Sequence, residues 1–173
     1  CQLWDVATGR AIAEFKDPAG GFGGAVAFSA PGDVLAMSAA NGEIQLWNPH
    51  TRSRVATLSG HASPATALVF SRDGKTLCSA AEDLSVRLWD LAANSEVASL
   101  NGHTRWVSSL ALSPDESILA SSSGDGTIRI WDLKLRREKL QLTNHVSLAW
   151  DVKFSPDGRL LATLETNRDG RSD

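Results

Sequence analysis

Apolar and polar residues alternate in short runs along this chain, and the pattern is clearest over residues 102–132. Ile128 and Ile130 alternate there with polar side chains, which is the period-2 pattern of a half-buried β-strand. Turn-forming residues separate the apolar runs at 113–115 and again at 125–126. The order strand, turn, strand, turn, strand leaves no room for a helix, so the stretch predicts antiparallel β-structure.

The same pattern recurs along the whole chain. A tryptophan followed by Asp or Asn closes the stretch, and this pair recurs at intervals of 43, 42 and 42 residues. An apolar residue followed by serine, and a Gly-His or Asn-His pair, recur with the 42-residue spacing as well. Three markers that agree on one period predict a protein built from tandem repeats. The tryptophans are Trp4, Trp47, Trp89 and Trp131, and the residues before serine are Phe28, Phe70, Leu112 and Phe154.

These motifs resemble those of the WD-repeat β-propeller family. The resemblance lies in the Gly-His pair, the Ser-Pro-Asp-Gly type of turn, the Asp six residues before Trp, and the Trp-Asp pair. It covers essentially the whole chain and implies an all-β propeller of about four blades, three complete and one split between the N- and C-terminal ends. It implies one propeller domain over residues 1–173, with repeats near residues 1–15, 19–58, 61–100, 103–142 and 145–164.

The two ends and the first complete repeat depart from the pattern. Pro18-Ala19 stands where the family has Gly-His, Met37 where it has Ser or Thr, and Asn41 where it has the turn Asp. Residues 1–5 match 44–48, so the chain begins in the middle of a repeat. We therefore expect a fragment that forms an open arc of a larger propeller. Closure of the same residues into a four-bladed ring is the alternative.

The resemblance also implies a hydrogen-bonded set of His, Ser or Thr, Asp and Trp inside each regular blade. Burying such polar groups costs little only if each one finds a partner. Ser, His and Asp also suggest a hydrolase. However, the set occurs twice in one repeat register, the serine lies in a predicted strand, and no nucleophile elbow is present, so we expect no catalytic residues. The sets are His61, Ser79, Asp83 and Trp89, and His103, Ser121, Asp125 and Trp131.

The charge and the residue composition of the chain argue against several classes of binding partner. The formal net charge of −3 provides no overall attraction to nucleic acid or to an anionic membrane, and the basic cluster at 134–139 lacks an aromatic platform for bases. Cys78 lies in an apolar run and is predicted to be a small core residue, and no His or Cys spacing suggests a metal site. We expect no cofactor, no small-molecule substrate, no membrane-spanning segment and a cytoplasmic location.

Family propellers bind ligands at the face where strand starts and certain turns emerge, and the resemblance transfers those positions to this chain. It implies a partly apolar rim that binds a protein or peptide. Packing of Trp106 and Trp150 on the core or on neighbouring blades is the alternative. The predicted partner-binding residues are Phe22, Glu82, Trp106, Leu148 and Trp150.

Two functions remain open from the sequence. The first is a non-catalytic scaffold for protein–protein interaction, because exposed aromatic side chains at a rim are typical of interfaces. The alternative is a regulatory or sensor propeller segment within a larger multidomain signalling protein or enzyme. A flanking kinase or nucleotide-binding motif in a longer reading frame would favour the second.

Overall fold

The regular structure of the described residues consists of β-strands. The computed structural model describes residues 1–16, 22–143 and 147–166, and all the regular elements among them are antiparallel strands. The all-β prediction is therefore confirmed. The predictions made for Pro18-Ala19 and for His145 lie outside the described residues.

Three four-stranded sheets lie between two hairpins, and each sheet connects consecutive strands of the chain. Hairpin β1–β2 comprises Gln2–Asp5 and Arg10–Glu14, and hairpin β15–β16 comprises Ala149–Phe154 and Leu161–Glu165. Blade 1 comprises β3 (Phe22–Phe28), β4 (Leu35–Ala39), β5 (Ile44–Asn48) and β6 (Ser53–Leu58). Blade 2 comprises β7 (Ala65–Phe70), β8 (Thr76–Ala81), β9 (Val86–Asp90) and β10 (Ser95–Leu100). Blade 3 comprises β11 (Val107–Leu112), β12 (Ile118–Ser123), β13 (Ile128–Asp132) and β14 (Arg137–Leu142).

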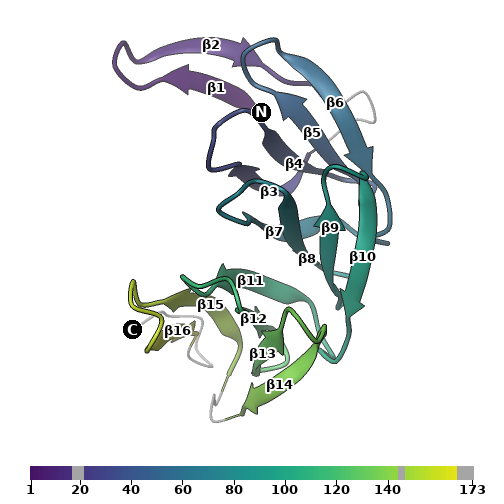
Figure 1. Cartoon of the computed structure of the whole chain (residues 1–173), viewed down its shortest axis with the longest axis vertical. Coiled ribbons are helices and arrows are strands. Elements are labelled where there is room, and N and C mark those ends of the chain that lie inside the picture. Colours follow the sequence, from purple (N-terminus) through teal and green to yellow (C-terminus); the bar gives the residue numbers. More distant parts are fainter. Residues whose placement is uncertain (17–21, 144–146, 167–173) are drawn as a thin grey trace.

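The sheets are arranged as an arc. The first strand of each blade lies on the concave side and the last strand lies on the convex side, and the hairpins β1–β2 and β15–β16 lie at opposite ends (Figure 1). Neighbouring first strands contact one another in the order β3, β7, β11, β15. The sheets do not close into a ring, so the open arc expected from the sequence describes them and the four-bladed ring does not.

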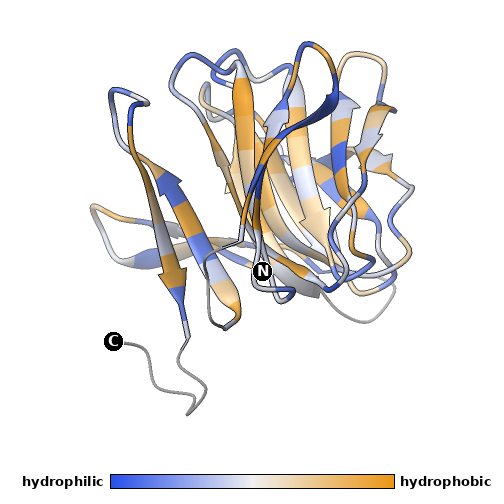
Figure 2. Cartoon of the chain, turned by 90° about the horizontal axis from the view of Figure 1, so that it is seen from below, coloured by the Kyte–Doolittle hydropathy of each residue, from blue (hydrophilic) through white to orange (hydrophobic). Residues whose placement is uncertain are grey.

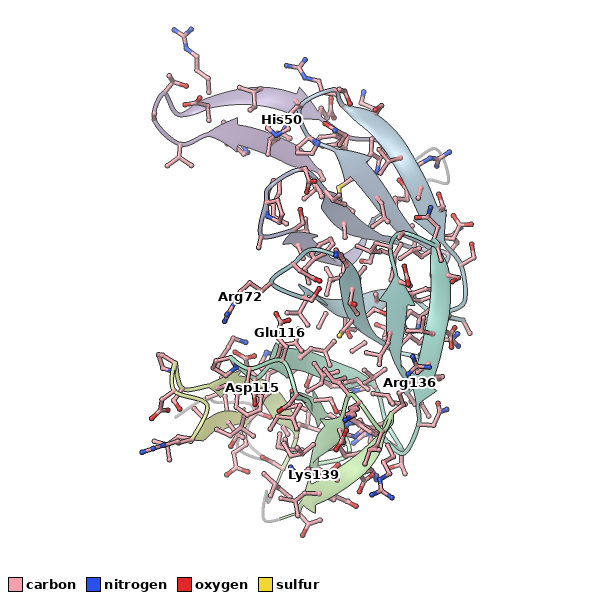
Figure 3. All side chains as sticks on the ribbon, viewed as in Figure 1. His50, Arg72, Asp115, Glu116, Arg136 and Lys139 are labelled. Atoms are coloured by element: carbon pink, nitrogen blue, oxygen red, sulfur yellow. The ribbon has the colours of Figure 1, made fainter. Side chains whose placement is uncertain are left out.

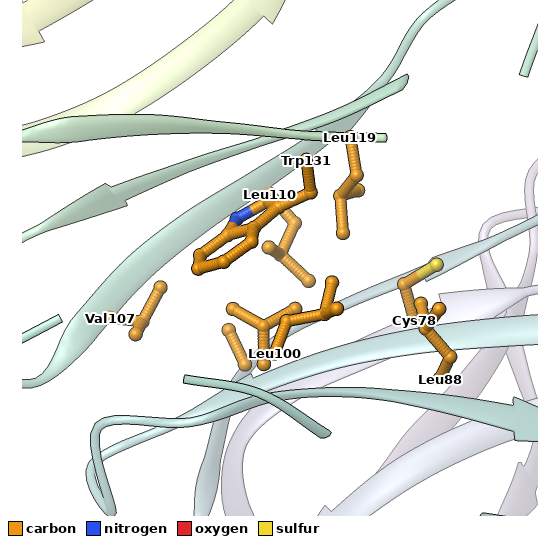
Figure 4. Packing of buried hydrophobic residues seen from close by; sticks show 9 residues of the cluster. Cys78, Leu88, Leu100, Val107, Leu110, Leu119 and Trp131 are labelled. Atoms are coloured by element: carbon orange, nitrogen blue, oxygen red, sulfur yellow. The ribbon is translucent and has the colours of Figure 1, made fainter. Parts of the chain in front are cut away.

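The hydrophobic core is divided among the interfaces between neighbouring sheets. The cluster in Figure 4 joins Cys78, Leu88 and Leu100 of blade 2 to Val107 and Trp131 of blade 3. Equivalent clusters lie between blades 1 and 2 and between blade 3 and β15–β16. Hydrophobic residues concentrate in the stacked strands and hydrophilic residues in the turns (Figure 2). Stacking of repeats that cannot bury their faces alone explains this division.

Cys78 lies within one of these clusters. Its side chain is buried, and burial raises the pKa of its thiol to about 12. Because the reactive form of cysteine is the thiolate, this thiol is chemically inert at neutral pH. Cys78 is therefore a small apolar residue of the core.

Tight turns connect the third and fourth strands of each repeat, and one residue in each turn has a left-handed backbone. This residue is Gly9 in the first hairpin and Asn94 in blade 2, but Arg52 and Arg136 take the same place with φ of 59° and 53°. Gly and Asn adopt this conformation at the lowest cost, so the two arginines mark turns whose shape the sheet imposes.

The turns between the first and second strands lie at the opposite edge of the blades from the predicted rim. Glu116 has φ of 58° where Gly32, Gly74 and Gly158 occupy the corresponding turns. Its carboxylate accepts a hydrogen bond from the backbone N–H of Arg72 in blade 2. Figure 3 shows these two residues at the adjoining ends of blades 2 and 3. The contact ties the two blades together at this edge.

Candidate functional site

Blade 2 contains a continuous chain of hydrogen bonds among four side chains. His61 Nδ1 lies 2.9 Å from Asp83 Oδ2, and His61 Nε2 lies 2.7 Å from Ser79 Oγ. The indole N–H of Trp89 donates to the same Ser79 oxygen at 2.8 Å. Each of the four side chains therefore has at least one partner within the blade, as buried polar groups require.

Blade 3 repeats this arrangement. His103 Nδ1 lies 3.0 Å from Asp125 Oδ2, and His103 Nε2 lies 2.7 Å from Ser121 Oγ. Trp131 donates its indole N–H to Ser121 Oγ at 2.8 Å. The equivalent distances agree because the blades have the same strand register.

Electrostatics define the protonation states in these networks. Burial lowers the pKa of His61 and of His103, although the hydrogen bond to the aspartate opposes this shift. For Asp83, burial alone would raise the pKa, but hydrogen bonds from Ser85, the Ala62 N–H and His61 lower it to about 2. At neutral pH the imidazole is therefore neutral, donates from Nδ1 to an ionised aspartate, and accepts the serine proton at Nε2.

The geometry resembles a Ser-His-Asp triad, but the serines have no access to a substrate. Ser79 and Ser121 are 0% exposed, and each hydroxyl already bonds the histidine and the tryptophan. A nucleophile must reach a reacting atom from the solvent side. The networks are therefore suited to holding the blade together.

A second set of residues lies at the edge where each blade begins. The pairing of the first and second strands contains a bulge there, and the residues between the paired positions are Thr66 in blade 2, Ser108 in blade 3 and Trp150 in β15. A bulge leaves one residue outside the ladder and redirects its side chain. The bulges therefore present these three side chains at one edge of the arc.

This edge is hollowed by a cavity of about 390 Å³, and successive sheets contribute to its wall. We call it the upper rim cavity. Its volume falls within the range of ligand pockets in proteins. The lining residues are Gly24, Thr66, Glu82, Trp106, Ser108 and Trp150.

Trp106 and Trp150 form one wall of the upper rim cavity. Their rings make an edge-to-face pair with centroids 5.4 Å apart and an interplanar angle of 81°. Trp106 is half-buried, whereas Trp150 is 51% exposed. A large aromatic side chain in contact with water is unfavourable, and burial by a partner is one way to compensate.

Gly124 supports the Trp106 ring. A Cβ atom at Gly124 would lie 2.7 Å from Trp106 Cε2, so only glycine lets the indole rest against this backbone. The carbonyl of Trp106 also accepts hydrogen bonds from the Gly124 N–H and from the Ser123 hydroxyl, both at 2.9 Å. The position of the indole is therefore determined by the fold before any partner arrives.

The remaining predicted rim residues differ in their placement. Glu82 is exposed, lies in the turn between β8 and β9, and lines the cavity. Leu148 is half-buried, and its carbonyl accepts a hydrogen bond from the backbone of Thr166, but it does not line the cavity. Phe22 begins β3, and its side chain lies outside the described residues.

Sequence reasoning missed Leu84 at the same edge. Its backbone φ is 73° and its side chain is 39% exposed. Gly42 and Gly126 occupy the equivalent turn positions, with φ of 87° and 79°. A branched residue in this region is strained, and such strain is often found near functional sites. The repeat register alone would have identified this substitution.

Other site classes find little support in the described parts of the chain. Residues 1–16, 22–143 and 147–166 contain no group of three or more His, Cys, Asp or Glu that could hold a metal ion. The same residues include no helix long and apolar enough to cross a membrane.

Stacked four-stranded blades, each with a buried Trp-Ser-His-Asp network in its regular copies, define a repeat protein of the propeller class. The chain matches the family model described as WD domain, G-beta repeat, at residues 52–90, 94–132 and 136–171. The matched segments start 42 residues apart and cover more than half of the chain, so the chain belongs to the WD-repeat family. No curated protein matches it. WD repeats generally mediate protein–protein interactions, and domains built from them are typically non-catalytic.

Proposed function

We propose that this chain is a non-catalytic scaffold that binds a protein or peptide segment at the upper rim cavity. The observation that carries the proposal is the wall of Trp106 and Trp150 beside Glu82, which faces solvent at one edge of the arc. Tryptophans that are partly accessible in a preformed hollow are the kind of side chain on which interface energy concentrates. The prediction for Phe22 and Leu148 as further contact residues remains part of this proposal.

The absence of catalysis is part of the same proposal. The buried serines of the two hydrogen-bond networks support it, because neither hydroxyl is accessible. The upper rim cavity itself presents one carboxylate, two hydroxyls and two indoles, and it lacks a nucleophile paired with a base. This is the composition of a binding surface.

Selection from a random peptide library displayed on phage tests the proposal. We expect the wild-type chain to enrich a set of related peptides, and Trp106→Ala to lose them. Trp4→Ala is the matched control, because Trp4 is 55% exposed and lies in hairpin β1–β2, which contributes no residue to the cavity lining. Equal enrichment by Trp106→Ala and wild type, with both folded by circular dichroism, would contradict the proposal.

A further inference from the structure

The two hydroxyl groups that line the upper rim cavity both use their protons within the protein. Thr66 Oγ1 lies 2.5 Å from the carbonyl of Val107 and donates its proton there. Ser108 Oγ donates to the carbonyl of Ala149 at 2.7 Å. A hydroxyl has one proton and two lone pairs, so both groups can offer a ligand only acceptor lone pairs.

The second hydrogen bond of Ser108 agrees with this assignment. Ser122 Oγ lies 2.8 Å from Ser108 Oγ, and because the Ser108 proton is used at Ala149, Ser122 is the donor. Glu82 adds a carboxylate, which accepts hydrogen bonds and carries negative charge. It makes no ion pair with any described residue. The polar part of the wall is therefore acceptor-rich and anionic.

The aromatic part of the wall adds to this preference. The faces of indole rings carry negative electrostatic potential and attract cations. Trp106 and Trp150 both line the cavity and their rings are nearly perpendicular, so a cation bound there lies beside two indole rings. A cation with several N–H donors satisfies both the rings and the acceptors.

We infer that the upper rim cavity binds the primary ammonium group of a lysine side chain from the partner. This inference rests on the proposed function and names the partner's chemistry at that site. An ammonium group has three donors that point in different directions, which suits acceptors contributed by two blades. The planar guanidinium of arginine directs its donors within one plane and prefers a bidentate carboxylate.

Titration with n-butylammonium chloride, followed by NMR of the indole N–H resonances, tests the inference. The Trp106 and Trp150 resonances are assigned by Trp106→Phe and Trp150→Phe, and the other four of the six tryptophans are internal controls. We expect saturable shifts of these two signals alone, with a roughly millimolar dissociation constant for so small a probe. We expect n-butanol, which lacks the charge, to leave the signals unshifted.

Two variants separate charge from shape. Glu82→Gln keeps the size of the side chain and is expected to weaken n-butylammonium binding about tenfold through loss of the counter-charge. Glu43→Gln, in the equivalent turn of blade 1 and outside the cavity lining, is the matched control and is expected to bind as wild type. Gly124→Ala displaces the Trp106 ring without changing charge and is expected to weaken binding as well.

The outcomes separate this inference from the proposed function. Tighter binding of n-butylguanidinium than of n-butylammonium would overturn the lysine assignment in favour of arginine. Equal binding of n-butanol, or no effect of Glu82→Gln, would overturn the cation assignment. If phage selection enriches peptides that need Trp106 but show no preference for lysine, the inference fails and the scaffold function stands. If neither probe nor peptide binds, both fail.

Discussion

Blade 1 and blade 3 each have a tryptophan in the third strand, but a different side chain accepts the hydrogen bond from its indole N–H. In blade 3 the indole N–H of Trp131 reaches Ser121, which belongs to the network with His103 and Asp125. In blade 1, Met37 occupies the position of Ser121, and Trp47 donates instead to Gln45 Oε1 at 3.2 Å. Both blades have the tryptophan, but the group that accepts the hydrogen bond from its indole N–H differs.

The changes in blade 1 occur as a set. Met37 is buried beside Phe15 and Leu35, and Phe15 forms an edge-to-face pair with Trp47 at a centroid distance of 5.3 Å. Gln45 replaces the arginine that forms an ion pair with a glutamate in blades 2 and 3. Apolar side chains thus replace the polar network, and the acceptor lies in β5, the same strand as Trp47, whereas Ser121 lies in β12, next to the strand of Trp131. The comparison teaches that satisfaction of the indole N–H is the shared requirement of the blades.

The largest effect is expected from Trp131→Ala. This change opens a cavity between blades 2 and 3 and leaves the buried Ser121 short of a partner, so we expect a loss of about 3–5 kcal/mol in the free energy of unfolding. Trp47→Ala should cost less, because Trp47 is half-buried and its acceptor, Gln45, belongs to the same strand, β5, and not to a buried network across two strands. Denaturant midpoints measure both, with the exposed Lys134→Ala as control. Equal midpoints for Trp131→Ala and Lys134→Ala would contradict the assigned network.

A smaller effect, of opposite sign, is expected from Leu84→Gly. Blade 1 has Gly42 at this left-handed position, so the change gives blade 2 the turn of blade 1. Relief of the strained backbone should exceed the added freedom of glycine in the unfolded chain and raise stability by about 0.5–1 kcal/mol. The thermal midpoint measures the gain, and Leu91→Gly, which lies outside the left-handed region, should lower it. A lower midpoint for Leu84→Gly would show that its side-chain contacts outweigh the strain.

The smallest change is expected from mild acidification. The pKa of His61 and of His103 is lowered in the folded state, so the unfolded chain binds more protons below the ordinary histidine pKa. The contribution of the two histidines to stability is therefore fully present above the ordinary histidine pKa of about 6.5 and decreases as the pH falls below it. Blade 1 lacks this pair of groups, so exchange of its amide hydrogens should respond less than that of blades 2 and 3. A stability that rises on acidification would contradict the neutral histidines.

Much of the fold could be predicted because the repeat markers are independent of one another. A 42-residue period in Trp-Asp, in apolar-Ser and in Gly-His or Asn-His fixes the strand register without any structural information. The same register predicted the positions of Trp106, Glu82 and Trp150 at one edge. Their roles in binding stay predictions, since they depend on a partner.

The details of the candidate site could not be predicted, because they depend on contacts between residues that are distant in the sequence. The contact of Trp106 with Gly124 and its edge-to-face pairing with Trp150 join residues that are 18 and 44 positions apart in the sequence. Gln45 occupies a position that holds arginine in the other blades, so nothing in the sequence indicates that it is the acceptor for Trp47. The hydroxyls of Thr66 and Ser108 donate hydrogen bonds to carbonyls of the next sheet, which only the stacked structure reveals.

The division of the core among sheet interfaces has a consequence for how the molecule loses its structure. Each hydrophobic cluster is shared by two neighbouring sheets. The blades therefore behave as a row of coupled units, in which a change in one sheet affects mainly the stability of the adjacent sheets. Opening then starts most readily at the outer units, which have a neighbour on one side. Amide exchange should accordingly be slowest in β7–β9 and β11–β13 and faster in β1–β2 and β15–β16.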